Sequence, residues 1–236
     1  MQEKHHKWYS PSISKEFEML VFGDRGYPLI VFPTTAGQYY EARNWHLIDS
    51  VAWYVEQGLV QIFCPDGMNQ ESWYNKSIHP ADKVRTHNAY ENVILHDIVH
   101  RVRHNTNVGK VAVAGCSFGG YQAANFAWRN PWLVSHMFSL SGAFNIRSFL
   151  NGYYDQNAYF NNPEDYMGNN GNPKLWEMDI VLGAGTEDVC RKDSENMSKI
   201  LGAKNINHWL DIREGVHDWP LWREMFPHYL SRINFK

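Results

Sequence analysis

Cysteine is scarce in this chain of 236 residues: only Cys64, Cys116 and Cys190 occur, an odd number at wide spacing. Such usage does not form a disulfide framework and favours a reducing compartment, so we expect a cytoplasmic protein. The first ten residues are polar and contain no apolar core of a secretory signal. We therefore expect them to form a polar N-terminal tail.

Long hydrophobic runs and an excess of charge of one sign are also missing. No apolar stretch approaches the length of about 20 residues that spans a membrane, so no membrane partner is expected. The net charge is −3 and no basic cluster occurs, which argues against a nucleic-acid partner. Aromatic residues, in contrast, make up 15% of the chain, so large rings must fill the core or line a pocket.

Strand-like and helix-like segments alternate along the chain, with no internal repeat and no linker. This alternation predicts an α/β fold, with a mostly parallel sheet covered by helices on both faces, in a single domain over residues 1–236. The expected strands are 16–22, 29–32, 60–64, 110–114, 134–140, 179–182 and 208–212. The expected helices are 42–56, 88–103, 120–128, 193–201 and 219–230, the last one kinked or interrupted by Pro227.

Residues 145–172 break this alternation and are rich in Asn, Tyr, Gly and Phe. They follow an expected strand, and loops at the carboxyl ends of parallel strands form the ligand crevice in sheets of this type. We expect a short cap over the site, with a long surface loop as the alternative.

The pentapeptide 115–119 reads Gly-Cys-Ser-Phe-Gly and lies between an expected strand and an expected helix. A serine on such a turn is pushed out of the sheet with its hydroxyl exposed, and the flanking glycines allow the sharp turn. The N-terminus of the following helix directs free N–H groups at negative charge that develops there. Ser117 is therefore the candidate nucleophile; the alternative is a glycine-rich turn that only packs a helix on the sheet.

A serine hydroxyl needs a histidine as base and an acid that orients the histidine, in the chain order Ser, acid, His on this fold. Among the histidines after Ser117, His136 lies in an expected strand, His208 begins one and His228 lies on the last helix. His217 lies in an expected loop beside Gly and Pro, from which it can reach across to the serine. We select it as the base.

The acid is expected directly after the strand 179–182, where Asp188 is our choice and Glu187 and Asp193 are the alternatives. The oxyanion hole needs two N–H donors, and the residue after the nucleophile, Phe118, supplies one of them. The other is expected from the loop 33–37. We favour the N–H of Thr35, with Thr34 and Ala36 as alternatives.

The segment 96–100 reads His-Asp-Ile-Val-His and resembles the zinc motif His-Glu-x-x-His. Aspartate replaces glutamate, no third ligand is evident, and the apolar stripe of Tyr90, Ile94 and Ile98 leaves His96 on the opposite side of the helix. We therefore expect a solvated helix face, and neither a metal nor another cofactor.

These motifs resemble the bacterial "putative esterase" family of α/β-hydrolases, which is related to S-formylglutathione hydrolases, feruloyl esterases and mycolyltransferases. The resemblance implies the α/β-hydrolase fold and a metal-free serine hydrolase whose nucleophile, acid and base match Ser117, Asp188 and His217. It also implies that Trp73 and Tyr74 lie near the pocket, although their composition alone is equally typical of core aromatics. The segments that carry the resemblance are 8–11, 32–37, 71–74, 115–120, 140–142, 159–163 and 217–222.

The function implied by this resemblance is hydrolysis of a small-molecule carboxylic ester through an acyl-enzyme. An acyltransferase with the same triad and a catalytically inactive, hydrolase-like binding domain are the alternatives. Many relatives have His-Gly or a similar pair where this chain has Pro33-Thr34, which leaves the second oxyanion donor open. The sequence does not identify the acyl and alcohol groups of the substrate, and it leaves the formation of a homo-oligomer open.

Overall fold

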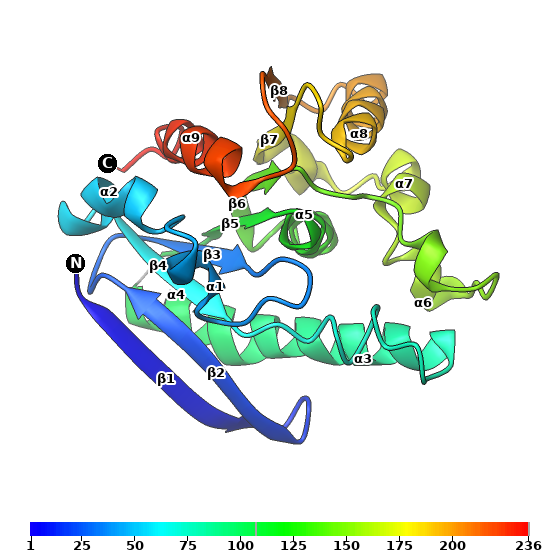
Figure 1. The fold of residues 1–236 in the computed structure, drawn as a ribbon, viewed down its shortest axis with the longest axis horizontal. Helices are drawn as coiled ribbons and strands as arrows, with labels where there is room; N and C mark the ends of the chain where they lie inside the picture. Colours follow the sequence, from blue (N-terminus) through cyan, green and yellow to red (C-terminus); the bar gives the residue numbers. More distant parts are fainter. Residues whose placement is uncertain (107, 236) are drawn as a thin grey trace.

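An eight-stranded sheet forms the centre of the computed structural model, which describes residues 1–106 and 108–235 (Figure 1). Its strands are β1 (Glu3–Ser10), β2 (Lys15–Phe22), β3 (Tyr27–Phe32), β4 (Val60–Pro65), β5 (Val111–Cys116), β6 (Val134–Leu140), β7 (Asp179–Gly185) and β8 (Trp209–Arg213). They are arranged in the order β1-β2-β4-β3-β5-β6-β7-β8. β2 pairs antiparallel with β1 and β4. The remaining strands β3 to β8 all run parallel to one another.

The central strands are apolar runs because both of their faces are covered. β5 reads Val-Ala-Val-Ala-Gly-Cys, and all of its residues are buried. β3 and β7 are buried at every position except the first. Parallel strands between two helical layers show this continuous pattern, in contrast to the alternation of a half-exposed sheet.

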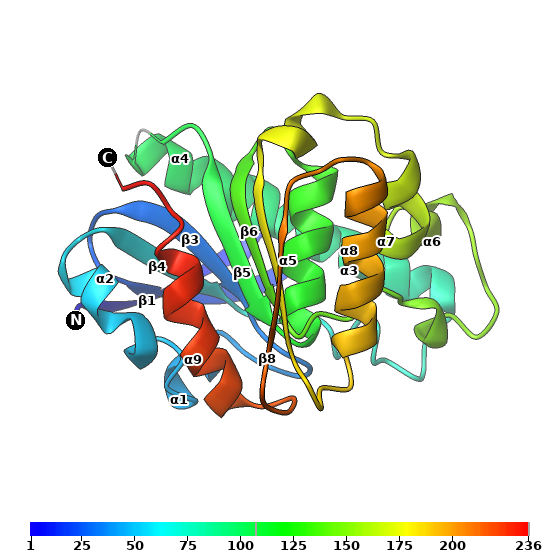
Figure 2. The ribbon, with the colours of Figure 1, turned by 90° about the horizontal axis from the view of Figure 1, so that it is seen from above.

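Helices cover both faces of the sheet, as Figure 2 shows. The helices are α1 (Glu41–Asn44), α2 (Ala52–Glu56), α3 (Pro80–Asn92), α4 (His100–Thr106), α5 (Phe118–Arg129), α6 (Gln156–Tyr159), α7 (Pro163–Tyr166), α8 (Arg191–Ala203) and α9 (Trp219–Leu230). Helices α3, α5 and α8 pack on one face, and α2 and α9 pack on the other. The expected α/β class is confirmed. No helix among residues 1–106 and 108–235 is long and apolar enough to cross a membrane.

The expectation of a polar N-terminal tail was wrong. Residues Glu3–Ser10 form the edge strand β1, which pairs with β2 along its whole length. Most of its side chains are exposed or half-buried. The sequence of β1 therefore lacks the alternation of apolar and polar residues that indicates a strand with one face in the core. A polar edge strand is a common way to prevent sheets from pairing edge to edge.

The expected continuous helix over 42–56 was also wrong. The structure divides it into α1, a 3₁₀ turn at Asp49–Val51 and α2. Between α1 and the 3₁₀ turn, His46 has φ of 60°, in the left-handed region that ends a right-handed helix. Leu47 and Ile48 are nevertheless buried. The apolar pattern therefore predicted correctly which side chains are buried, but not that the helix is broken.

The helix expected over 88–103 runs from Pro80 to Thr106 through α3, a π-helical segment at Val93–Val99, and α4. It begins earlier because Pro80 stands at the first helical position and the His79 ring accepts a hydrogen bond from the Ala81 N–H at 3.2 Å. The expected interruption at Pro227 is absent, and α9 continues past this proline to Leu230.

Candidate active site

Ser117 occupies a strained turn between β5 and α5. Its backbone has φ of 54° and ψ of −122°, a combination that non-glycine residues rarely adopt. The Ser117 N–H donates to the carbonyl of Leu140 at 2.8 Å, which ties the turn to the end of β6. The side chain thus stands at the N-terminus of α5 and at the carboxyl ends of the parallel strands.

Two glycines allow the close packing around this turn. A Cβ atom on Gly115 would lie 2.3 Å from the backbone of Gly119, and a Cβ atom on Gly119 would lie 2.4 Å from the carbonyl oxygen of Phe32. Only a hydrogen fits at either position. The end of β3, and with it the loop 33–37, therefore lies directly against the first turn of α5.

The structure brings His217 to Ser117 and to Asp188. The loop between β8 and α9 carries the histidine, and its Nε2 lies 2.8 Å from Ser117 Oγ. On the other side of the ring, Nδ1 lies 2.8 Å from Asp188 Oδ1. The loop after β7 is joined to the histidine loop, because the Glu187 N–H donates to the carbonyl of Gly215 at 2.9 Å. Three segments far apart in sequence thus form one hydrogen-bonded chain.

The carboxylate of Asp188 is fully buried and is held by several donors. Besides His217, the Ser141 hydroxyl donates to Oδ2, and the Cys190 N–H donates to Oδ1 at 2.8 Å. Burial alone raises the pKa of Asp188, but these hydrogen bonds outweigh it and leave the pKa below its ordinary value. Asp188 is therefore ionised at neutral pH, as an acceptor for an imidazolium must be.

The alternatives for base and acid lie elsewhere. Glu187 is exposed, and Asp193 lies in the first turn of α8. The His136 ring is directed at the hydroxyl of Ser135 at 2.8 Å, inside β6. Among the described residues, Asp188 is the only carboxylate that pairs with the His217 ring.

The loop 33–37 presents one free N–H group. Thr34 donates its N–H to Glu41 Oε2 at 2.8 Å, and Ala36 donates its N–H to Asn69 Oδ1 at 2.8 Å. The N–H of Thr35 between them has no hydrogen-bond partner among residues 1–106 and 108–235. The same holds for the N–H of Phe118, because the first turn of a helix leaves its donors without intrahelical partners.

Two residues that shape this site were missed by the sequence reasoning. Asn69 is 1% exposed, and its amide clamps the loop by accepting from Ala36 and donating to the carbonyl of Thr34 at 2.8 Å. Ser141 holds Asp188 and accepts a hydrogen bond from Trp222 Nε1 at 2.8 Å. Asn69 has no sequence signal, whereas Ser141 lies in the segment 140–142 that carries the family resemblance.

Trp73 and Tyr74 lie in different surroundings. Trp73 is fully buried and packs against His87 and Tyr121, so it has no surface open to a ligand. Tyr74 is half-buried, with its ring centroid 5.3 Å from that of Phe118 and its hydroxyl 2.9 Å from Thr35 Oγ1. Only Tyr74 of this pair borders the candidate site.

The segment 145–172 contributes to the same region. It contains α6, α7 and short 3₁₀ turns, and its Phe149 ring lies 4.9 Å from the Tyr74 ring and 5.9 Å from the Phe118 ring, between centroids. Residues of the loop 33–37 also line a polar cavity of about 360 Å³, whose lining includes Ala36, Asp66 and Glu71. The loop that carries Thr35 therefore contacts the aromatic ring of Tyr74 and also lines a polar cavity.

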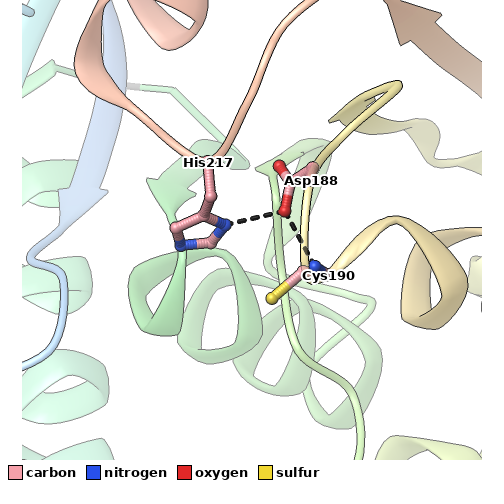
Figure 3. A group of neighbouring side chains, drawn as sticks. All are labelled: Asp188, Cys190 and His217. Atoms are coloured by element: carbon pink, nitrogen blue, oxygen red, sulfur yellow. Dashed lines mark hydrogen bonds and ion pairs between the residues drawn. The ribbon is translucent and has the colours of Figure 1, made fainter.

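Cys190 stands beside the acid and the base. Its sulfur, a carboxylate oxygen of Asp188 and a ring nitrogen of His217 all lie within 4.8 Å of one another (Figure 3). Burial, together with the charge of Asp188, raises the pKa of the Cys190 thiol to about 12. The thiol is therefore protonated at neutral pH, and a protonated thiol is a poor nucleophile.

The His96–His100 pair has no third ligand among the described residues. Both side chains are exposed on the long helix, and their ring centroids are 5.7 Å apart. The only cluster of three histidine, cysteine or carboxylate side chains found in the described part of the chain is the one at Asp188, Cys190 and His217.

A mostly parallel sheet with a serine on the turn between strand and helix is the architecture of the α/β-hydrolases. A ferulic acid esterase structure superposes with a TM-score of 0.77 at 16% identity, covering 96% of this chain and 95% of that chain. The ferulic acid esterase AmCE1/Fae1A from the anaerobic fungus Anaeromyces mucronatus superposes with a TM-score of 0.75 at 13% identity, covering 99% of this chain and 90% of that chain. At such identities the likeness shows the α/β-hydrolase fold.

The S-formylglutathione hydrolase of Staphylococcus aureus has the same fold, with a TM-score of 0.74 at 13% identity over 98% of this chain and 95% of that chain. The sequence model of the family described as "Putative esterase" matches residues 25–233. This chain therefore belongs to that esterase family and is an ester hydrolase. No curated protein matches its sequence.

Proposed function

We propose that this protein is a serine carboxylesterase that hydrolyses small-molecule esters through an acyl-enzyme. The observation that supports the proposal most directly is the hydrogen-bonded chain from Ser117 Oγ through the His217 ring to Asp188. It joins a nucleophile, a base and an acid at one point, at the N-terminus of a helix.

In the proposed reaction, Ser117 attacks the ester carbonyl while His217 Nε2 takes the proton of the hydroxyl. Asp188 holds the proton on Nδ1, which keeps Nε2 free as the base and stabilises the imidazolium that forms. The tetrahedral oxygen lies between the N–H groups of Thr35 and Phe118, which have no other partner within the described residues. His217 then protonates the leaving alcohol, and in the second half-reaction it activates the water that releases the acid.

The surroundings of this site suggest how a substrate lies. Tyr74 and Phe149 offer an aromatic surface beside Phe118, and the segment 145–172 acts as a short cap on that side within a single domain. The reaction needs no cofactor, because the nucleophile, base and oxyanion donors all come from the chain. Three free cysteines fit a reducing, cytoplasmic location.

The test is a Ser117→Ala variant, assayed with a chromogenic short-chain ester and with a fluorophosphonate probe. We expect turnover to fall by about 10⁴-fold or more and labelling to disappear, while the circular dichroism spectrum is unchanged. The matched control is Ser77→Ala, which removes an exposed serine hydroxyl and should leave both readouts intact. Turnover that survives in Ser117→Ala, or a wild-type protein that resists the probe, would contradict the proposal.

A further inference from the structure

We propose that Cys190, Asp188 and His217 form an inhibitory binding site for a thiophilic divalent cation such as Zn²⁺. Binding of the ion rests on the three side chains alone, whereas its inhibitory effect rests on the proposed function. The proposed esterase reaction uses the aspartate and the histidine and leaves the cysteine side chain without a role. The site therefore consists of two groups of the reaction and one group that the reaction does not need.

The three side chains offer the ligand types that zinc prefers. Each contributes one atom, a thiol sulfur, a carboxylate oxygen and an imidazole nitrogen, and these atoms lie within 4.8 Å of one another. A tetrahedral zinc ion with bonds of about 2.0–2.3 Å holds its ligands roughly 3.3–3.8 Å apart. Adjustments of about 1 Å bring the three atoms into that range, and a water molecule completes the tetrahedron.

Local structure keeps the three ligands together. The backbone N–H of Cys190 donates to Asp188 Oδ1 at 2.8 Å, so the carboxylate is held against the backbone of the residue that carries the thiol. Figure 3 shows the thiol of Cys190 beside the pair of His217 and Asp188. His217 is 24% exposed and Cys190 is half-buried, so an ion reaches the site from solvent although the carboxylate is buried.

The bound ion blocks the base by changing which ring nitrogen carries the proton. In the resting chain Nδ1 of His217 faces Asp188 and Nε2 faces Ser117. An ionised Asp188 accepts a proton from Nδ1, which leaves the lone pair on Nε2. A metal that binds Nδ1 replaces the proton on that nitrogen, and the proton is transferred through solvent to Nε2, so the ring stays neutral. Nε2 is then a donor and accepts no proton from Ser117. The thiol gives its proton to solvent when the metal–sulfur bond forms, so one proton is released for each ion bound.

The experiment compares wild type with Cys190→Ser, each normalised to its own metal-free activity. Ester hydrolysis is titrated with free Zn²⁺ in a chelator buffer, and Cd²⁺ binding is followed by the ultraviolet band of a cadmium–thiolate bond. We expect inhibition of the wild type that a chelator reverses, and one cadmium–thiolate band per chain. Cys190→Ser should lose the band and need at least about tenfold more Zn²⁺ for half-inhibition.

The matched control is the double variant His96→Gln, His100→Gln, which removes the exposed histidine pair on the long helix. It should keep both the cadmium band and the wild-type inhibition. A band that persists in Cys190→Ser, equal inhibition of Cys190→Ser and wild type, or loss of inhibition in the histidine double variant would each overturn the proposal. If the protein proved not to be an esterase, the cadmium band would still report whether the site binds metal.

Discussion

The hydroxyl of Ser141 donates a hydrogen bond to the buried carboxylate of Asp188. Ser141 itself is fixed, because its N–H donates to the carbonyl of Gly183 at 2.7 Å and its oxygen accepts from Trp222 Nε1. The acid of the proposed triad is thus positioned by the ends of two neighbouring strands, β6 and β7, and by helix α9. In this position it meets His217 across the carboxyl edge of the sheet.

Replacement of Ser141 by alanine should lower kcat about tenfold and change KM little. A hydrogen bond to a charged group contributes about 1.5–3 kcal/mol, and its loss leaves the carboxylate less firmly oriented toward His217. Steady-state kinetics of Ser141→Ala measure the effect. The control is Ser135→Ala, which removes a half-buried hydroxyl hydrogen-bonded to Tyr27 at 2.6 Å, away from the site. Equal kcat values for wild type and Ser141→Ala would show that this hydroxyl does not position the acid.

Asn69 should matter more for catalysis than the side chain of Thr35. The Asn69 amide makes two hydrogen bonds of 2.8 Å with the loop that presents the Thr35 N–H, and Asn69→Ala removes both. The oxyanion donor then loses its fixed position, so we expect kcat to fall by about 10- to 100-fold.

Thr35→Ala is the matched variant, because it keeps the backbone N–H and deletes only the exposed contact of Oγ1 with the Tyr74 hydroxyl. Its kcat should stay within a fewfold of the wild-type value. Measurement of kcat for both variants tests the proposal, and a Thr35→Ala enzyme that is more impaired than Asn69→Ala would contradict it.

Gly119→Ala should destabilise the protein, because the new Cβ would lie 2.4 Å from the carbonyl oxygen of Phe32 and 2.7 Å from that of Pro33. Both neighbours are backbone atoms at the end of β3, so relief requires a shift of the strand or of α5. We expect a loss of about 1–3 kcal/mol or more in the free energy of unfolding. Urea unfolding provides the measurement.

The control for this change is Gly202→Ala in α8, where an added Cβ meets nothing within 4 Å. Alanine in a helix is favoured over glycine by up to about 1 kcal/mol, so this variant should be slightly more stable than wild type. If both glycine variants unfolded at the same urea concentration, close packing at Gly119 would not be the reason for the glycine.

Much of the fold could be predicted because its pattern is local. The strand at 134–140 and the helix at 219–230 have the bounds that their apolar residues indicate. The turn at Ser117 was predicted because a tight turn between strand and helix demands glycines at fixed spacing. Strand β1 was missed because an exposed edge strand carries no apolar signal, and the break at His46 was missed because a left-handed histidine has no sequence signature.

The site could be predicted only for residues whose role fixes their order along the chain. Ser117, Asp188 and His217 lie together in the structure, as their sequence order suggested, and their catalytic role stays a prediction. Asn69 and Ser141 act through contacts made by distant segments, Asn69 on the loop 33–37 and Ser141 on Asp188. No local pattern encodes such contacts, so only the folded chain reveals them.

An ion pair between a buried carboxylate and a half-buried guanidinium fastens the segment 145–172 to the helices beneath it. Glu91 of α3 pairs with Arg129 of α5, and Arg129 also donates to Asn161 Oδ1 at 2.7 Å. Asn125 donates to Glu91 at 2.8 Å. Burial raises the pKa of Glu91, but the charge of Arg129 and the hydrogen bonds outweigh it, so the folded pKa lies below the ordinary value.

Glu91→Gln should lower the free energy of unfolding by about 1–3 kcal/mol at neutral pH, since it leaves the half-buried Arg129 charge without its carboxylate partner. A lowered folded pKa means that the stabilisation is complete above the unfolded value of about 4.3 and is lost as the pH falls through the folded value. The stability difference between wild type and variant should therefore shrink in acid. Urea unfolding at several pH values measures this difference. The control is Glu177→Gln, which removes the ion pairs of an exposed carboxylate with Lys174 and Lys110 and should change stability little. A difference that stayed constant from neutral to acid pH would show that the Glu91 charge does not provide the stabilisation.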